Sequence, residues 1–255
     1  MLSVNELQLG YHGGQSVIKN LCLELPENKV VGLIGPNGCG KSTLLKGLCR
    51  LIQPQSGSIL LRQQDMAQLN NRQIARQISV LPQAQTNPEG LSVRQLVEYG
   101  RTPYVSHWGK LSAADNQIVD SVMHEMSIQS LAETPLEALS GGQQQRAWLA
   151  MVLAQDTDII MLDEPTTYLD ISYQIELMKL IRELKERGKS IIVVLHDLNQ
   201  AARYCDLLVV LKSGELKMMG TPTEVMTETM LADIFDVQAK VIIDPVAGSP
   251  MCVYV

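Results

Sequence analysis

One octapeptide constrains the fold of this 255-residue chain more than any other feature. Residues 35–42 read Gly-Pro-Asn-Gly-Cys-Gly-Lys-Ser, which matches the pattern G-x-x-x-x-G-K-[ST] at every fixed position. An apolar run precedes this segment at 30–34, and a helical pattern follows at 42–51. A buried strand that runs through a glycine-rich loop into a helix directs backbone N–H groups at a phosphate. Because both flanking elements are present, we interpret residues 35–42 as a phosphate loop rather than a chance match.

The phosphate loop predicts a binding site for a nucleoside triphosphate. Glycines are needed where a side chain would collide with the phosphates or could not adopt the backbone angles. Lys41 is expected to reach the β- and γ-phosphates, and Ser42 is expected to ligate Mg²⁺. The predicted nucleotide-binding residues of this segment are Gly35, Pro36, Asn37, Gly38, Cys39, Gly40, Lys41, Ser42 and Thr43.

A second element places two adjacent carboxylates at the end of a strand. Residues 159–162 are apolar and lead directly into Asp163 and Glu164. Asp163 is expected at the strand tip, where it would bind the water shell of Mg²⁺. Glu164 follows it and is placed to polarise the attacking water as a general base. The alternative is a surface Asp-Glu turn after a core strand. With a phosphate loop in the same chain, we favour the catalytic interpretation.

A third element at 139–143 reads Leu-Ser-Gly-Gly-Gln and opens a helical pattern at 143–152. Alone, Ser-Gly-Gly is a polar turn at the start of a helix. Such a turn is again an anion site, because it combines free N–H groups, a serine hydroxyl and the positive end of the helix dipole. One ATP needs only one phosphate loop. A second site for a γ-phosphate in the same chain therefore suggests that the turn at 139–143 contacts the nucleotide of a neighbouring chain.

The composition is consistent with an α/β enzyme. Hydrophobic residues make up 45% of the chain and aromatic residues only 4%, so the core must be aliphatic. Such a core suits helices packed on a buried parallel sheet. The net charge of −6 argues against general nucleic-acid binding. Five cysteines without a CxxC pair indicate neither a disulfide framework nor a zinc site. We see no signal peptide and no apolar run long enough to cross a bilayer.

The hydrophobic pattern also suggests how the chain is organised. Apolar positions alternate over 2–25, which predicts antiparallel strands, whereas 87–138 are mostly helical in pattern. An amphipathic helix is predicted over 172–187, between two short buried strands. A further helix is predicted near 223–235, followed by a strand-like tail. The inward face of the 172–187 helix is predicted to comprise Ile175, Met178, Ile181 and Leu184.

Taken in order, these motifs resemble the nucleotide-binding subunit of an ATP-binding cassette (ABC) transporter. The resemblance covers essentially the whole chain, and the family's signature sequence matches residues 139–143 without change. It implies a P-loop NTPase (RecA-like) core with an N-terminal antiparallel β subdomain and an inserted α-helical subdomain. The expected single ABC ATPase domain comprises a nucleotide-binding core (1–86 and 154–220), a helical subdomain with the signature motif (87–153) and a C-terminal extension (221–255).

In that family the signature turn (139–143) faces ATP held by the phosphate loop of a partner subunit. The resemblance therefore implies a homodimer that shares two ATP molecules, each with Mg²⁺. The implied trans contacts are Ser140, Gly141, Gly142, Gln143 and Asp170. The implied Mg²⁺ ligands are Ser42, Gln83 and Asp163, and the implied catalytic residues are Glu164, His196 and Lys41.

Three single residues and one short loop also resemble functional positions of the family, and each of the three residues has a structural alternative. Tyr11 resembles the aromatic residue that stacks on adenine, but it could also be a strand-end core residue. Gln83 resembles the glutamine that joins Mg²⁺ and the γ-phosphate to the membrane subunit, although a lone glutamine is usually a surface residue. His196 resembles the switch histidine, although a histidine at a strand end is often structural. Tyr168-Leu-Asp170 resembles the interface loop of the dimer, with Tyr168 where the family commonly has alanine.

Cys39 lies inside the phosphate loop, beside a helix N-terminus that favours a thiolate. We interpret it as a small filler residue. We nonetheless predict that alkylating agents inhibit the ATPase and that ATP protects it.

Several segments narrow the resemblance within the family. Residues 88–101, 153–155, 165–170 and 196–206 are similar to ferric-siderophore and vitamin B12 importers. Residues 106–116, and Pro-Met-Cys at 250–252, are most similar to the ATPase of ferric dicitrate importers. This resemblance implies that the chain binds two polytopic permease subunits, cooperates indirectly with a periplasmic substrate-binding protein and binds no nucleic acid. It also implies a peripheral position on the cytoplasmic face of the bacterial inner membrane.

Three alternatives remain at this point. One is the ATPase of a vitamin B12 or heme-type importer. Another is a non-transport ABC ATPase that acts on DNA or ribosomes, although such relatives usually carry two cassettes or long coiled-coil insertions. The third is a regulatory module without turnover, which would tend to lack Glu164 or His196; both are present.

Overall fold

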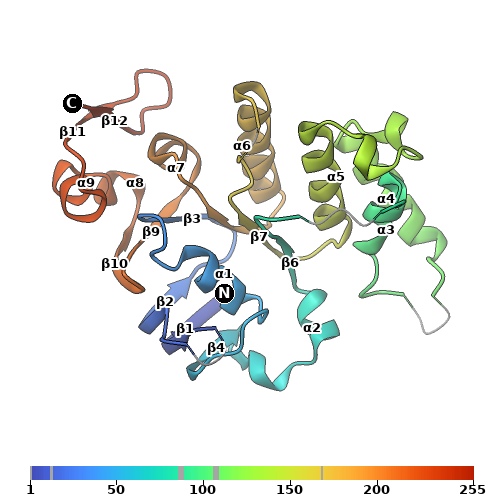
Figure 1. Ribbon diagram of the computed structural model, residues 1–255, viewed down its shortest axis with the longest axis horizontal. Helices are drawn as coiled ribbons and strands as arrows, with labels where there is room; N and C mark the ends of the chain where they lie inside the picture. Colours follow the sequence, from blue (N-terminus) through green and yellow to red (C-terminus); the bar gives the residue numbers. More distant parts are fainter. Residues whose placement is uncertain (1, 12–13, 86–88, 106–108, 168) are drawn as a thin grey trace. The chain divides into compact units, whose positions relative to one another are not determined.

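The computed structural model describes residues 2–11, 14–85, 89–105, 109–167 and 169–255. The chain divides into two compact units, of which one comprises Met1–Leu69 with Met178–Val255 and the other comprises Asn70–Leu177. Figure 1 labels the helices and strands of both units.

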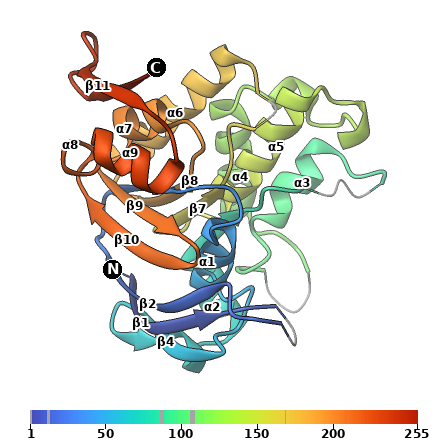
Figure 2. The same cartoon turned by 60° about the vertical axis from the view of Figure 1, so that its left-hand side comes forward.

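The first unit begins with an antiparallel sheet. β1 (Leu2–Leu9) pairs with β2 (Ile18–Leu25) on one side and with β4 (Ser56–Leu61) on the other. β4 continues to β5 (Gln64–Asp65) and to a 3-10 turn, η1 (Met66–Gln68). Figure 2 shows β1, β2 and β4 side by side. Buried apolar residues alternate with exposed residues along β2, as expected for a sheet with one solvated face. The predicted antiparallel N-terminal strands are confirmed.

A second sheet of the first unit is parallel at its centre. β3 (Val30–Ile34) lies between β8 (Ser190–Val194) and β9 (Leu207–Lys212) and runs parallel to both. β10 (Glu215–Gly220) adds an antiparallel strand to β9. Every residue of β3 and β8 is buried, which explains their unbroken aliphatic sequences.

Two helices of the first unit pack on these strands. α1 (Lys41–Leu48) contacts β1 of the antiparallel sheet and β8 of the parallel strands. α7 (Leu198–Tyr204) contacts β3. The phosphate loop thus leaves the central strand β3 and enters a helix that is held between two sheets.

The C-terminal part of the first unit contains two short helices and a hairpin. α8 (Pro222–Val225) and α9 (Glu228–Phe235) replace the single helix predicted near 223–235. The break has a local cause, because the hydroxyl of Thr227 caps α9 and thereby starts a new helix. The strand-like tail is confirmed as β11 (Ala239–Ile243) paired antiparallel with β12 (Pro250–Tyr254).

The second unit carries a parallel strand pair. β6 (Ile78–Leu81) follows α2 (Asn71–Ala75) and pairs with β7 (Ile159–Asp163). All five residues of β7 are buried, including its terminal Asp163. α6 (Ile171–Glu186) begins in this unit and continues beyond it.

Helices make up most of the rest of the second unit. α3 (Val93–Tyr99), α4 (Ala113–Glu125) and α5 (Gly141–Ala154) pack against one another, as Figure 1 shows. Two 3-10 turns, η2 (Gln129–Leu131) and η3 (Leu136–Ala138), connect α4 to α5. The described residues of 87–138 thus contain the helices that their sequence pattern predicts.

The three helices start in the same way. Ser92, Ser112 and Ser140 each cap a helix through a reciprocal capping box with the residue three positions on. A buried ion pair joins Arg101 to Asp115, with their nitrogen and oxygen 2.8 Å apart. The hydroxyl and N–H groups of Ser112 and the Arg101 guanidinium lower the pKa of Asp115.

Some sequence expectations were wrong in detail. The helix after the phosphate loop ends at Leu48 rather than at residue 51, because Arg50 adopts a left-handed backbone conformation with φ 57°. Met178, Ile181 and Leu184 are buried on α6 as predicted, but Ile175 is 42% exposed. Ile171 is 75% exposed, so the first turns of α6 lie outside the core.

Candidate nucleotide-binding site

The backbone of the phosphate loop requires glycine at specific positions. Gly35 has φ 150°, and a Cβ there would lie 2.1 Å from the carbonyl oxygen of Leu211. Gly40 has φ 106°, and its Cβ would lie 2.7 Å from Cδ1 of Ile18. Gly38 has φ 74°, but a Cβ there would meet no described atom within 4 Å. The loop therefore needs glycine at 35 and 40 for its own packing, and at 38 for its backbone angle.

Lys41 is the main charged group of this loop. Its side chain is buried, with 5% of the residue exposed, and Nζ donates to the carbonyl oxygens of Gly35 (2.8 Å) and Pro36 (3.0 Å). Among the described residues, no side chain caps α1 at Gly40. Uncapped N–H groups and an ammonium held by two neutral carbonyls suit a polyanion, which is a stronger acceptor than either carbonyl.

Two other predicted residues belong to the first unit. Tyr11 is 51% exposed, which does not fit the core alternative, and its hydroxyl lies 3.4 Å from Oγ1 of Thr43 in α1. His196 is exposed shortly after the end of β8. The carboxylate of Asp197 caps α7 and so fixes the backbone next to His196.

The second unit brings a carboxylate and an amide together. Asp163 ends β7 and is only 2% exposed. Glu164 follows with a left-handed φ of 52°. Nε2 of Gln83 donates to Oε2 of Glu164 at 2.6 Å, and Oγ1 of Thr167 lies 3.5 Å from the same oxygen. The motifs suggested Gln83 and Glu164 separately, but nothing in the sequence indicated the bond between residues so far apart.

The signature turn begins α5. Oγ of Ser140 accepts from the N–H of Gln143 at 3.4 Å, and Oε1 of Gln143 accepts from the N–H of Ser140 at 2.9 Å. These bonds use acceptor atoms, so the serine hydroxyl and the glutamine amide keep hydrogens to donate. A Cβ on Gly141 would meet no described atom within 4 Å, and one on Gly142 would meet the Tyr173 ring at an ordinary 3.6 Å. The fold of this unit therefore does not demand glycine at either position.

Asp170 begins α6. Its Oδ1 accepts from the hydroxyl of Ser172 (2.9 Å) and from the N–H of Tyr173 (3.0 Å). These two donors, the backbone N–H first, lower the pKa of the Asp170 carboxyl. Tyr168, the other notable residue of the interface loop, lies outside the described residues.

The predicted residues thus fall into two sets. The first unit carries the phosphate loop with Tyr11 and His196, and the second carries the remaining residues, with Gln83 bonded to Glu164.

A family model and curated relatives show to which family the chain belongs. A model described as ABC transporter matches residues 18–167. The chain is 44% identical over 253 residues to the achromobactin transport ATP-binding protein CbrD of Dickeya dadantii (strain 3937), covering 99% of this chain and 94% of the relative. It is 42% identical over 252 residues to the iron(3+)-hydroxamate import ATP-binding protein FhuC of Bacillus subtilis (strain 168), covering 98% and 93%. The chain belongs to the ABC transporter family.

Solved structures of this family share the fold. An inward-facing ABC transporter described as metal-chelate type matches with a TM-score of 0.84 and 25% identity, over 100% of this chain and 96% of that chain. The dimeric bacterial ABC transporter cassette MJ0796 matches with a TM-score of 0.77 and 28% identity, over 87% and 98%. The predicted ABC ATPase fold is confirmed, and the chain is an ATP-binding ATPase of this family. In the part of the chain that is described, no helix is both long and apolar enough to cross a membrane.

The surroundings of Cys39 in the ABC phosphate loop lower the reactivity that we expect of its thiol. Its side chain is buried, and burial raises the pKa of the thiol despite the opposing charge of Lys41. The structure therefore supports the interpretation of Cys39 as a filler residue, which packs near Gly35.

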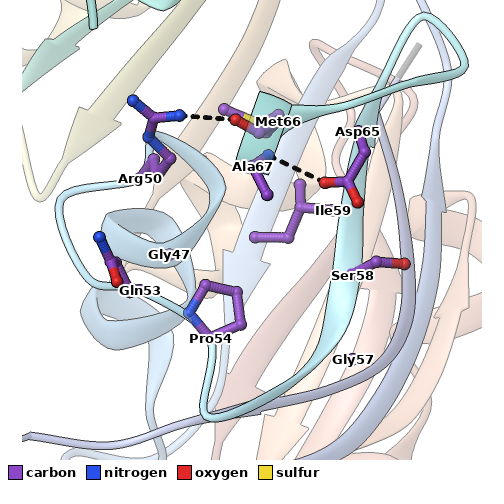
Figure 3. A pocket seen from close by; sticks show the side chains of 10 residues that line it. All are labelled: Gly47, Arg50, Gln53, Pro54, Gly57, Ser58, Ile59, Asp65, Met66 and Ala67. Carbon is purple, nitrogen blue, oxygen red and sulfur yellow. Dashed lines mark hydrogen bonds between the residues drawn. The ribbon is translucent and has the colours of Figure 1, made fainter. Parts of the chain in front are cut away.

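A cavity of about 320 Å³ lies at the other end of α1 and is separate from the phosphate loop (Figure 3). Two of its polar residues, Arg50 and Asp65, form hydrogen bonds within the fold. The Arg50 guanidinium donates to the carbonyl oxygens of Met66 (2.6 Å) and Leu69, and Asp65 accepts from the N–H of Ala67 at 2.9 Å. We therefore assign this cavity no part in nucleotide binding.

Proposed function

We propose that this ABC ATPase powers the uptake of an iron(III) complex across a bacterial inner membrane. The supporting observation is its identity, over nearly the whole chain, to an iron(3+)-hydroxamate import ATP-binding protein and to an achromobactin transport ATP-binding protein. These names favour an iron complex over vitamin B12 and over a non-transport role. Within this class we propose ferric citrate as the first cargo to test, because residues 106–116 and 250–252 are similar in sequence to ferric dicitrate importers.

The proposed active form is a head-to-tail dimer with two shared ATP molecules. The dimeric cassette with 28% identity supports a dimer of this kind. Gly141 and Gly142 support a trans contact, because neither glycine is required by the packing or the backbone of its own unit. Their small size is explained if the phosphates of an ATP from outside this unit approach the N-terminus of α5.

Within each proposed site, this chain's residues divide the chemistry. Lys41 leaves its two carbonyl acceptors and binds the β- and γ-phosphates. Glu164 orients and deprotonates the attacking water, and the Gln83 amide holds its carboxylate. His196 contacts the γ-phosphate and the same water, while the exposed Tyr11 ring is available to stack on adenine.

The donor chemistry also fits a divalent cation. Ser42, Gln83 and Asp163 offer a hydroxyl, an amide and a carboxylate oxygen, and Mg²⁺ prefers oxygen ligands. When bound, Mg²⁺ would neutralise charge that develops on the phosphates. We propose these three residues as its protein ligands.

The remaining assignments complete the proposal. Residues 1–86 with 154–220 form the nucleotide-binding core, 87–153 the helical subdomain and 221–255 a C-terminal extension. The helical subdomain transmits dimer closure to two polytopic permease subunits, and a periplasmic binding protein delivers the cargo to them. The ATPase would then act as a peripheral protein on the cytoplasmic face of the membrane.

Replacement of the proposed base tests the mechanism. Glu164→Gln, incubated with Mg²⁺ and ATP, is expected to lose turnover and to accumulate as a dimer, measured by light scattering. Glu133→Gln, which removes an exposed carboxylate of the same unit, serves as the control and is expected to turn over ATP normally. Persistent turnover of Glu164→Gln would contradict the catalytic assignment. Loss of turnover without a dimer, even with the permease subunits present, would contradict the shared site.

The cargo needs a separate test. Cells that lack the chain are expected to lose uptake of radioactive ferric citrate, and the wild-type chain, but not Glu164→Gln, is expected to restore it. Ferric hydroxamate and vitamin B12 uptake are measured in parallel. Restoration of hydroxamate uptake alone would identify a ferric hydroxamate, rather than ferric citrate, as the cargo. Restoration of vitamin B12 uptake alone would contradict an iron complex as the cargo.

A further inference from the structure

Tyr173 lies in the first turn of α6 and packs against the signature turn. A Cβ on Gly142 would lie 3.6 Å from both Cδ2 and Cε2 of the Tyr173 ring. On the next turn of α5, the Arg146 guanidinium lies 5.0 Å from the centre of that ring. Nη2 of Arg146 is also 3.5 Å from the Tyr173 hydroxyl. The ring therefore covers one side of α5 from Gly142 to Arg146.

Arg146 has a buried nitrogen beside the Tyr173 ring. Its Nε is buried and has no hydrogen-bond partner among the described residues. A buried guanidinium nitrogen without such a partner loses its hydration, and the ring face supplies part of the compensation. Cation–π contacts are strongest when they are desolvated. Nε of Arg146 is thus desolvated beside the ring, while the residue as a whole is half-buried.

The other side of Tyr173 is tied to the interface loop. Its backbone N–H donates to Oδ1 of Asp170 at 3.0 Å. Nε2 of the neighbouring Gln174 donates to the carbonyl oxygen of Leu169 at 2.9 Å. From α5, Nε2 of Gln145 donates to the carbonyl oxygen of Pro165 at 3.0 Å. Tyr173 therefore contacts the signature turn through its ring and Asp170 through its backbone, and bonds from Gln174 and Gln145 lie beside it.

We infer that Tyr173 is a positioning residue that holds the signature turn and Asp170 at a fixed spacing. Both would then reach the partner's ATP as one rigid piece. This inference rests on the proposed shared site, because the spacing matters only if both contacts act in trans. It also gives a function to a tyrosine that a general helical pattern would assign to ordinary packing.

The test compares the ring, the hydroxyl and the cation separately. Tyr173→Phe keeps the ring, Tyr173→Leu removes it, and Arg146→Met removes the cation but keeps a chain of similar length. Each is made in the Glu164→Gln background, and the ATP concentration that gives half-maximal dimer is measured by light scattering. Tyr104→Leu is the matched control, because Tyr104 also lies under an arginine, with the Arg101 guanidinium 4.0 Å from its ring centre.

The expected shifts follow from the contacts. Tyr173→Leu is expected to raise the ATP requirement about tenfold, and Arg146→Met about threefold, as the range of cation–π energies indicates. Tyr173→Phe is expected to stay within about twofold, because the hydroxyl contact is long. Tyr104→Leu is expected to leave the requirement unchanged. Affinity of each monomer for ADP, which the phosphate loop of the same chain determines, is expected to stay constant throughout.

Each outcome separates this inference from the proposed function. If Glu164→Gln alone forms no dimer, both the proposed shared site and the positioning role of Tyr173 are contradicted. If it dimerises but Tyr173→Leu and Arg146→Met require no more ATP than their parent, the positioning role is wrong. An equal loss in Tyr173→Phe and Tyr173→Leu would also contradict it, since the ring is the proposed element. Should Tyr173→Leu fail to fold, Arg146→Met decides the question.

Discussion

The phosphate loop and the signature turn both place glycines at the start of a helix, but for different physical reasons. At Gly35 and Gly40, positive φ angles and short distances to neighbouring atoms disfavour any other residue. At Gly141 and Gly142, neither condition holds within the described residues. The first loop therefore needs its glycines to fold, whereas the second needs them only for something that comes from outside its unit. Folding and function should be inseparable in one loop and separable in the other.

The largest expected effect is on the fold of the phosphate loop. A methyl group at position 35 would lie 2.1 Å from the Leu211 carbonyl oxygen, which belongs to a strand and cannot easily move. We expect Gly35→Ala to lower the free energy of unfolding by at least about 3 kcal/mol, as overpacking and backbone strain combine. Gly38→Ala, where a positive φ meets open space, is expected to cost only about 1–2 kcal/mol. Urea denaturation measures both, and equal losses would show that contact with Leu211 is unimportant.

Ser140→Asp is expected to have the next largest effect, and on activity alone. Aspartate caps helices about as well as serine, so the free energy of unfolding should change by less than about 1 kcal/mol. The new carboxylate would repel the γ-phosphate and removes a hydroxyl donor, so ATP hydrolysis should fall about 100-fold. Steady-state turnover and urea denaturation of the same protein test this.

The chain provides a matched control for that variant. Ser92 caps α3 through the same Ser-x-x-Gln capping box, with Gln95 in the role of Gln143. Ser92→Asp is expected to leave both stability and hydrolysis close to those of the wild type. If it lowers hydrolysis as much as Ser140→Asp does, the loss comes from altered caps rather than from a nucleotide contact.

Gly141→Ala should have a smaller effect, and it should raise the stability of the monomer while it weakens ATP-dependent dimerisation. Alanine in the first turn of α5 meets no described atom within 4 Å, and it is expected to stabilise the monomer by about 0.5–1 kcal/mol. The added methyl group would lie where the phosphates of the partner's ATP are proposed to approach the backbone of α5. ATP-dependent dimerisation should therefore weaken about tenfold. A variant that is more stable and dimerises normally would remove the main structural argument for a trans contact.

How far the sequence predicted this molecule depends on the distance between the residues concerned. The phosphate loop could be recognised because strand, glycines and helix follow one another within a few residues. The signature turn was equally local, and its Ser140 cap follows from the S-x-x-Q spacing. The left-handed backbone of Glu164 was not predictable, because no residue pattern marks it.

Contacts between distant residues were also beyond the sequence. The bond from Gln83 to Glu164 and the packing of Tyr173 on Gly142 depend on how helices and strands assemble. The same limit explains the error at Ile175, which has the spacing of a buried residue on α6 but lies on its exposed first turns. Periodicity predicts which residues share a face of a helix, but not how far the core extends along it.

Alkylation of Cys39 is the smallest expected effect and distinguishes packing from chemistry within the phosphate loop. Burial raises the pKa of this thiol, so less of the reactive thiolate is present at a given pH than in an ordinary cysteine. Labelling by iodoacetamide at neutral pH should therefore be at least about tenfold slower than at the exposed Cys22, and it should accelerate only at more alkaline pH. Mass spectrometry of labelled peptides measures both rates in one sample.

We expect ATP to slow the labelling of Cys39 but not of Cys22, and activity to fall in proportion to modification. Equal rates at the two cysteines would contradict the effect of burial, and full activity after complete modification of Cys39 would show that the loop tolerates a larger side chain there, unlike at Gly35.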